Sequence, residues 1–202
     1  REIGEKLIND PRIPLVSATG TTAMGKHVGK TVAARLGRHL LELGGNNAII
    51  VTPDADLDNA VKATLFGAVG TAGQRCTSTR RIIIHNSLKD KFIKVLANAY
   101  EQVPIGNPLK DGILMGPVVS QSAVEDLEKA IEEAKKAGGK LICGGKRIRP
   151  EGLEEGYYVT PAIMEAENHY RIVQEETFAP LLYIIGYYKV EDAVAMQNGV
   201  MQ

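Results

Sequence analysis

Apolar segments with the pattern of strands alternate along this chain with segments that have the spacing of amphipathic helices. The strand-like segments lie at residues 15–19, 39–51, 81–85, 140–143, 157–164 and 181–185, and the helical ones at residues 57–69, 88–103 and 120–136. Strands that alternate with helices are typical of layered α/β proteins. The order therefore predicts an α/β fold with a largely parallel sheet flanked by helices.

Composition narrows the classes of function. The 202 residues are 44% hydrophobic and carry 24 basic and 24 acidic residues, so no nucleic-acid partner is indicated. No apolar run approaches the roughly 18 residues that a membrane-spanning helix requires, and residues 1–6 are too polar for a signal peptide. The two cysteines form no disulfide framework, which favours a reducing, cytoplasmic location.

Cys76 is the first candidate for chemistry, because it lies where a predicted helix meets a predicted strand. Loops of this kind present reactive groups on a rigid scaffold. The adjacent Arg75 favours the thiolate, which is the form that attacks carbon. The alternative is that Cys76 is a small buried hydrophobe, which is the usual role of a free cysteine. We assign that structural role to Cys143, which lies in an apolar strand.

A strand that ends near Thr19 is followed by Gly20 and Thr21 and then by a predicted helix. A strand, a glycine turn and a helix form a common anion-binding arrangement, because the amides of the first helical turn can hold a phosphate. Residues 20–26 also match the nucleotide-triphosphatase pattern G-x-x-x-x-G-K. That match fails at His27, where the pattern needs Ser or Thr to hold magnesium. An ordinary capped helix is the remaining alternative.

Glu42 is a single carboxylate inside an apolar segment, followed by Gly44 and Gly45. A glutamate in a strand usually lies on the solvated face. A carboxylate partly buried among leucines has a raised proton affinity instead, and can act as a general base near neutral pH. The sequence leaves both interpretations open.

Glu175 and Glu176 stand immediately before the apolar strand at residues 181–185. They are either soluble residues at a sheet edge or include a ligand for ribose hydroxyls, a role that acidic residues have in nucleotide sites. The four histidines, at positions 27, 39, 85 and 169, show no metal-ligand spacing. We therefore predict no metal site.

Four ordered motifs together resemble the aldehyde dehydrogenase superfamily. They are Thr19-Gly-Thr, Leu41-Glu-Leu-Gly-Gly, Gly73-Gln-Arg-Cys and Glu175-Glu-Thr-Phe-Ala-Pro, and the resemblance runs through essentially the whole chain. Ala179 replaces the glycine usual in the wider superfamily. In that replacement and in the residues of the other motifs, the chain is most similar to the antiquitin branch, which oxidises α-aminoadipic semialdehyde in lysine breakdown.

The resemblance implies roles for particular residues. Cys76 would be the nucleophile that forms a thiohemiacetal and then a thioester, and Glu42 the base that activates the hydrolytic water. Gly20 and Thr21 would lie near the pyrophosphate of NAD. Leu43 would lie near the nicotinamide, and Glu176 would bind its ribose with Phe178 beside it. Arg75 immediately precedes the nucleophile, and an unpaired guanidinium in a partly desolvated pocket is costly, so we expect Arg75 to bind the carboxylate of a semialdehyde substrate. The alternative is that Arg75 points away and pairs with a structural acid.

The resemblance also implies how the chain is organised. Residues 1–43 would be the C-terminal part of a nucleotide-binding domain and residues 44–202 most of the catalytic domain. With no initiating methionine and no terminal cap, we expect a piece of a longer protein that forms a homo-oligomer, a dimer or a tetramer. NADP is not excluded, because the residue that reads the ribose 2′ position would precede Arg1.

Overall fold

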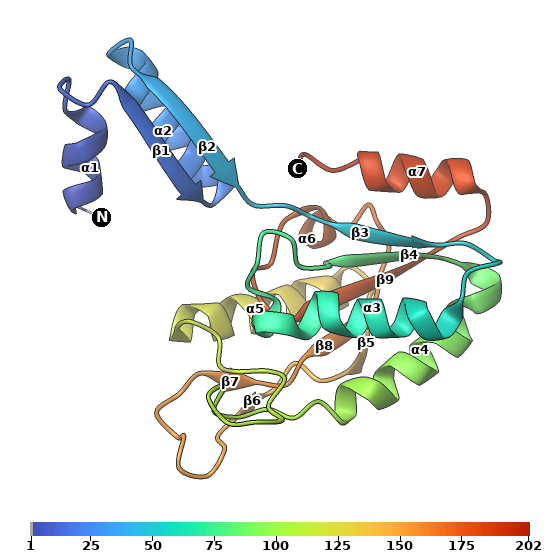
Figure 1. The fold of residues 1–202 in the computed structure, drawn as a ribbon. Coiled ribbons are helices and arrows are strands. Elements are labelled where there is room, and N and C mark those ends of the chain that lie inside the picture. Colours follow the sequence, from blue (N-terminus) through green and yellow to red (C-terminus); the bar gives the residue numbers. More distant parts are fainter. Residues whose placement is uncertain (1) are drawn as a thin grey trace. The chain divides into compact units, whose positions relative to one another are not determined.

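A computed structural model describes residues 2–202 of the chain (Figure 1). The chain divides into two compact units, residues 1–45 and residues 46–202. This division falls close to the predicted boundary between residues 43 and 44. What each part does is not decided by the division and stays a prediction.

The first unit is a strand, a helix and a parallel strand, preceded by one further helix. Its elements are α1 (Glu2–Asn9), β1 (Leu15–Gly20), α2 (Thr22–Ala34) and β2 (Arg38–Leu43). β1 and β2 pair in parallel, with Gly20 opposite Leu43. The strand that the sequence predicts from residue 15 is therefore confirmed, and α1 is a helix that the sequence analysis did not predict.

The core of the first unit lies on one face of its two strands. Ile8, Val28 and Val32 are buried together, and Leu41 of β2 packs against them. Alternate residues of a strand point to opposite faces, so Glu42 lies on the face away from this core and is exposed. Of the two interpretations that the sequence leaves open, the solvated face holds in the described chain, because the leucine neighbours of Glu42 point the other way.

The second unit is built on a five-stranded sheet in the order β3-β4-β9-β8-β5. The strands are β3 (Ala48–Val51), β4 (Arg81–His85), β5 (Lys140–Cys143), β8 (Ala162–Glu165) and β9 (Leu181–Tyr187). All neighbouring pairs are parallel except β5 with β8, which are antiparallel. The predicted α/β fold with a largely parallel sheet is confirmed, with one antiparallel strand at an edge.

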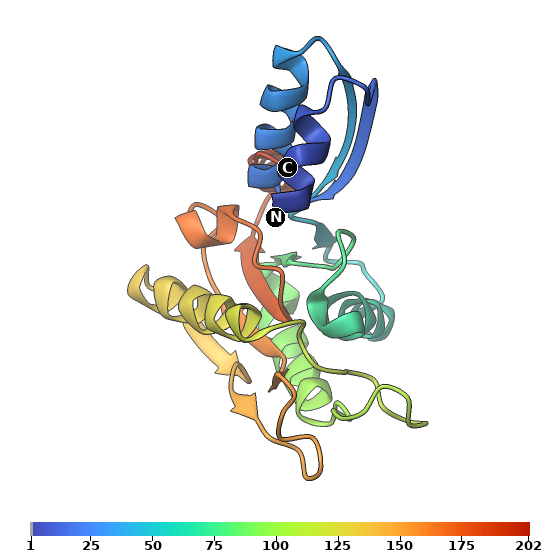
Figure 2. The ribbon, with the colours of Figure 1, turned by 90° about the vertical axis from the view of Figure 1, so that its left-hand side faces the viewer.

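Helices cover both faces of this sheet, as Figures 1 and 2 show. On one side lie α3 (Leu57–Val69) and α4 (Asn86–Glu101), and on the other lie α5 (Gln121–Lys136), the short α6 (Arg171–Gln174) and α7 (Val190–Asn198). The residues of β4 alternate accordingly. Ile82 and Ile84 belong to the main core, whereas Ile83 packs with Ala193 of α7. β4 is thus buried on both faces, which is typical of a strand in a parallel sheet.

One element differs from the sequence analysis. The apolar segment at residues 157–164 is two strands, because the short β7 (Tyr158–Val159) pairs with β6 (Arg147–Ile148) and β8 starts after Pro161. Proline cannot donate a backbone hydrogen bond, which suits such a break.

Candidate active site

Cys76 lies in an exposed turn between α3 and β4. After α3, a short 3₁₀ helix (Gly70–Gly73) brings the chain toward the sheet. Thr71, Ala72 and Gly73 have φ angles of 57°, 53° and 68°, all in the left-handed region. Residues other than glycine adopt this conformation only when the surrounding structure enforces it, and such strain is common at functional sites.

Gly73 is required by packing as well as by its backbone angle. A Cβ atom at this position would collide with the carbonyl oxygen of Ala179, in the segment that precedes β9. The turn that carries Cys76 and the segment 176–180 are therefore in direct backbone contact. Two of the predicted motifs, about a hundred residues apart in sequence, form one local structure.

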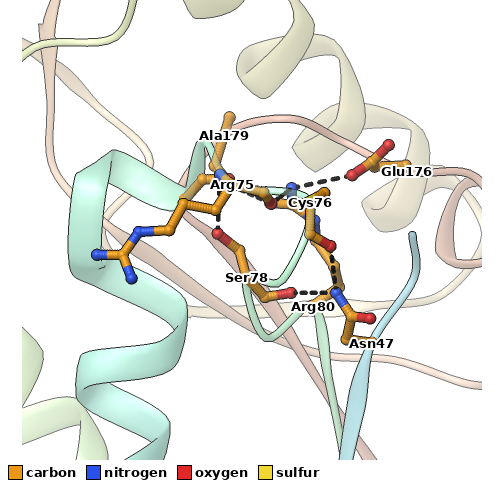
Figure 3. Close-up of polar contacts among 8 residues, drawn as sticks. Asn47, Arg75, Cys76, Ser78, Arg80, Glu176 and Ala179 are labelled. Carbon is orange, nitrogen blue, oxygen red and sulfur yellow. Dashed lines mark hydrogen bonds and ion pairs between the residues drawn. The ribbon is translucent and has the colours of Figure 1, made fainter. Parts of the chain in front are cut away.

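Side chains hold the backbone of the turn, among them those of Asn47 and Ser78 (Figure 3). The side-chain amide of Asn47 donates to the carbonyl oxygen of Cys76 at 2.7 Å and to that of Ser78 at 3.0 Å. The hydroxyl of Ser78 accepts from the amide of Arg75 at 3.1 Å. Gln74 reaches the loop before α5, where its side-chain oxygen accepts from the amide of Val119 at 2.8 Å. The thiol is thus exposed while the main chain beneath it is fixed.

Arg80 is a buried cation below this turn, with only 3% of its side chain exposed. Its guanidinium donates to the carbonyl oxygens of Gly73 and Arg75 and to the carboxylate of Glu176. Burial lowers the pKa of the Arg80 guanidinium, and the charges of Glu176 and Cys76 act in the opposite direction.

The structure separates the two adjacent glutamates. Glu175 pairs on the surface with Arg171, with 54% of its side chain exposed. Glu176 lies 3.1 Å from Arg80 with 12% exposed, so it is not a solvated edge residue. Phe178 is 45% exposed, and its ring lies 5.2 Å from the guanidinium carbon of Arg80. An oriented carboxylate therefore stands beside an exposed aromatic ring.

Arg75 points away from Cys76, toward α3 (Figure 3). Its Nε donates to the hydroxyl of Thr71 at 2.5 Å, and its guanidinium carbon lies 5.6 Å from the centre of the Phe66 ring. Arg75 is exposed, so the premise of a desolvated guanidinium is wrong. Its partners in the described chain are a hydroxyl and a ring, and substrate binding by Arg75 stays a prediction.

The other cysteine has a different environment. Cys143 ends β5 and is half-buried. Burial raises the pKa of its thiol, so at neutral pH the group stays protonated and unreactive. This agrees with the structural role predicted from its apolar strand.

The glycine turn of the first unit forms a capped helix start. Gly20 is the last residue of β1, and the hydroxyl of Thr21 accepts from the amide of Met24 at 3.1 Å, which makes Thr21 the N-cap of α2. Leu43 ends β2, and its side chain fills the space beside Gly25. His27, where a triphosphatase needs a magnesium ligand, lies 2.7 Å from Glu5 instead. These contacts do not favour the triphosphatase alternative.

The sequence analysis did not select Asn47 or Arg80 as site residues. The detectable signals were two consecutive asparagines after the paired glycines and two consecutive arginines at the start of a buried strand. Basic residues are rarely buried unless paired, so such a position suggests a specific partner. Within residues 2–202 no group of three His, Cys, Asp or Glu side chains is arranged to hold a metal ion. No helix in the same range is long and apolar enough to cross a membrane.

Two curated relatives show what this chain is similar to. Aldehyde dehydrogenase family 7 member A1 of Brassica napus is 49% identical over 201 residues, which cover 100% of this chain and 40% of that protein. The α-aminoadipic semialdehyde dehydrogenase of Bos taurus is 46% identical over 203 residues, covering 100% and 37%. The chain thus spans about 40% of the length of the relatives it matches.

Solved structures and the family profile agree with these relatives. A crystal structure of betaine aldehyde dehydrogenase from Staphylococcus aureus, in complex with NAD+, has a TM-score of 0.94 and 34% identity, and the match covers 98% of this chain and 40% of that one. Residues 1–201 match the profile of the aldehyde dehydrogenase family. The resemblance seen in the four motifs is confirmed, and this chain belongs to the aldehyde dehydrogenase family.

Proposed function

We propose that the protein containing this chain oxidises an aldehyde to a carboxylic acid with NAD, through a covalent intermediate on Cys76. The observation that carries this proposal is the exposed thiol of Cys76 on a turn whose main chain is fixed by Asn47, Ser78 and Arg80. A nucleophile needs access to substrate together with a precise position. Family membership supports the same reaction.

In the first step the sulfur of Cys76 attacks the aldehyde carbon and forms a C–S bond, and the carbonyl oxygen becomes an oxyanion. The backbone amide of Cys76 would donate to that oxyanion, which is the usual way to stabilise a tetrahedral intermediate. The product is a thiohemiacetal. Loss of a hydride from its carbon then leaves a thioester on Cys76.

Residues within each unit suit one part of a nicotinamide dinucleotide, which would supply the hydride acceptor when bound. The N-cap of α2 at Thr21 suits a pyrophosphate, because a helix start favours anions. Glu176 holds one carboxylate oxygen against Arg80 and keeps the other for the ribose hydroxyls. We assign Gly20 and Leu43 to the same binding site, beside the pyrophosphate and the nicotinamide respectively. Phe178 presents an exposed ring next to Glu176.

In the last step water cleaves the thioester. Glu42 would take a proton from that water, and the hydroxide would add to the acyl carbon and release the carboxylic acid and the Cys76 thiolate. Exposure of Glu42 in β2 leaves its carboxylate accessible to water. The overall change is aldehyde, NAD+ and water to carboxylate, NADH and two protons.

For the substrate we propose an amino-acid-derived semialdehyde such as α-aminoadipic semialdehyde. The name of the Bos taurus relative supports this choice. Arg75 would bind the substrate carboxylate with two parallel hydrogen bonds, which a guanidinium offers and an ammonium does not. In the present arrangement Arg75 lies on Phe66, so this role requires its exposed side chain to turn. The domain boundary at residue 43 and homo-oligomer formation are proposed from family resemblance, and a cytoplasmic location from the lack of a disulfide framework.

The test is cofactor reduction by the full-length protein containing this chain, with NAD and NADP across a panel of aldehydes. Cys76→Ala should abolish reduction, because it removes the atom that forms the covalent intermediate. Cys143→Ala is the matched control and should keep parental turnover, since that thiol is half-buried and protonated. Turnover by the Cys76 variant at the parental rate would refute the mechanism, and a loss confined to the Cys143 variant would mean that the wrong thiol was chosen.

A further inference from the structure

Arg80 joins two parts of the candidate site that the proposed function uses for different purposes. We propose that Arg80 is a positioning residue that fixes the turn carrying Cys76 and the carboxylate of Glu176 in one mutual geometry. The inference rests on the proposed function, in which Cys76 binds the substrate and Glu176 binds the cofactor. Neither the motifs nor the comparisons assign a role to Arg80.

Two nitrogens of the Arg80 guanidinium connect the cysteine turn with the segment 176–180 (Figure 3). Nη1 donates to the carbonyl oxygen of Gly73 at 2.6 Å and to that of Ala179 at 3.2 Å. Nη2 donates to the carbonyl oxygen of Arg75 at 3.1 Å and to Oε1 of Glu176 at 3.1 Å. Each amino nitrogen therefore connects one acceptor in the cysteine turn with one acceptor in the segment 176–180.

Charge and burial make this bridge stiff. Arg80 and Glu176 are exposed by 3% and 12%, and the ring of Phe178 covers the guanidinium at 5.2 Å. Breaking a buried ion pair on one side leaves an uncompensated charge, which is strongly unfavourable. The carboxylate of Glu176 is thereby held in one direction. A shift of the cysteine turn would strain the same guanidinium that orients the cofactor carboxylate.

The neighbouring Arg81 provides a matched control. It is completely buried, and its guanidinium donates to the carbonyl oxygens of Asn46 and Met196 and to the side chains of Asn168 and Gln197. None of these partners belongs to the cysteine turn or to the segment 176–180. Substitution of Arg81 therefore removes a buried arginine of the same type without touching the proposed bridge.

The experiment uses the full-length protein, with NAD dissociation constants, the alkylation rate of Cys76 by iodoacetamide without cofactor, and thermal stability as readouts. We expect Arg80→Met to raise the NAD Kd about tenfold, as loss of a charge-assisted contact does. It should also change the alkylation rate about threefold, because the turn that carries Cys76 loses its hydrogen bonds to the carbonyl oxygens of Gly73 and Arg75. Glu176→Gln should raise Kd and leave alkylation near the parental rate.

The double variant Arg80→Met/Glu176→Gln should have an NAD Kd no higher than that of the single variant with the higher Kd, because the two residues act as one unit. Arg81→Met should lose stability while Kd and the alkylation rate stay within about twofold of the parent. If Arg80→Met does not fold, Arg80→Lys replaces it, with Arg81→Lys as control. Lysine keeps the charge but has too few donors for four acceptors, so Kd and the alkylation rate should both change in the same direction as in Arg80→Met.

Several outcomes would overturn the inference. The first is that the Arg80 and Glu176 substitutions raise the NAD Kd independently. The second is that the Arg80 and Arg81 variants change Kd and the alkylation rate equally. The third is an unchanged Kd in Arg80→Lys. If the parent binds no nicotinamide dinucleotide, the proposed function fails separately. The alkylation rate still decides the inference in that case, since parental alkylation in Arg80→Met would refute a link between Arg80 and the cysteine turn.

Discussion

Glu42 is exposed because successive side chains of β2 point to opposite faces of the strand. Its neighbour Leu41 packs on the core of the first unit, so Glu42 points to the opposite face. An apolar neighbourhood in sequence therefore did not become an apolar neighbourhood in space. A base role for Glu42 must rest on access to water and on family membership, without help from burial.

Glu42→Gln should allow acylation of Cys76 and slow deacylation, because the amide keeps the shape of the side chain but cannot accept the proton from water. Removal of a general base costs about 10²–10⁴-fold in rate. Intact-mass spectrometry of the variant with aldehyde and NAD should detect the acyl adduct. Glu5→Gln, which alters an exposed glutamate of the same unit, should show none. Parental turnover without an adduct would remove Glu42 from the hydrolytic step.

Arg75→Ala distinguishes a substrate contact from a structural one. We expect a higher KM and a loss in kcat/KM for a carboxylate-bearing semialdehyde equivalent to a charge-assisted contact of about 1.5–3 kcal/mol, with a much smaller change for hexanal. Phe66→Leu removes the ring that Arg75 contacts and should leave the ratio of the kcat/KM values for the two substrates unchanged. Equal losses on both substrates in Arg75→Ala would assign Arg75 to the fold or to the thiol.

Among the elements, α3 carries the chain toward the Cys76 turn and is fixed at its start by Asp56. The side chain of Asp56 accepts from the amide of Asn59 at 3.0 Å, a helix N-cap bond that satisfies an otherwise unpaired donor. At the other end, Val69 is completely buried, and the left-handed segment begins at Thr71, directly after Gly70. The position of the cysteine turn thus depends on where this helix starts and ends.

Asp56→Ala should lower the free energy of unfolding by about 1 kcal/mol, the usual cost of a lost N-cap. Asp58→Ala is a matched control, because Asp58 lies in the first turn of the same helix but forms only an exposed pair with Lys62. Such pairs contribute little to stability. Chemical denaturation of both variants would measure the difference, and equal losses would show that the cap contributes no more than a surface charge.

At the scale of the whole molecule, the two units differ greatly in the amount of core they contain. The first unit buries Ile8, Val28 and Val32 beneath two strands, whereas the second has a continuous core that spans five strands and several helices. A two-stranded sheet and a few buried side chains are marginal for independent folding. Most of the apolar burial that stabilises the described chain therefore belongs to residues 46–202.

A peptide of residues 1–45 should accordingly fail to fold by itself, whereas residues 46–202 should unfold cooperatively. Circular dichroism on heating would show a gradual, nearly linear change for the peptide and a sigmoidal change for the longer piece. A cooperative transition in residues 1–45 would contradict this prediction. It would mean that the small core on one face of β1 and β2 is sufficient.

The sequence by itself determined the order and type of the main elements, because their signals are local. The spacing of apolar residues in α3 and α5, the N-cap positions Asp56 and Ser120, and the isoleucines of β4 each require only a few neighbouring residues. The ordered motifs also identified the family and selected Cys76 as the reactive thiol over Cys143. The catalytic and cofactor roles assigned from those motifs stay predictions.

Only the tertiary structure decided which polar groups meet. Arg80 and Glu176 are 96 residues apart in sequence, and no local pattern distinguishes Arg80 from Arg81. The direction of Arg75 and the exposed face of Glu42 also depend on what packs beside them. Periodicity encodes which face of an element is apolar, but the partner of a buried charge is set by strand order and by the closing of distant segments onto one another.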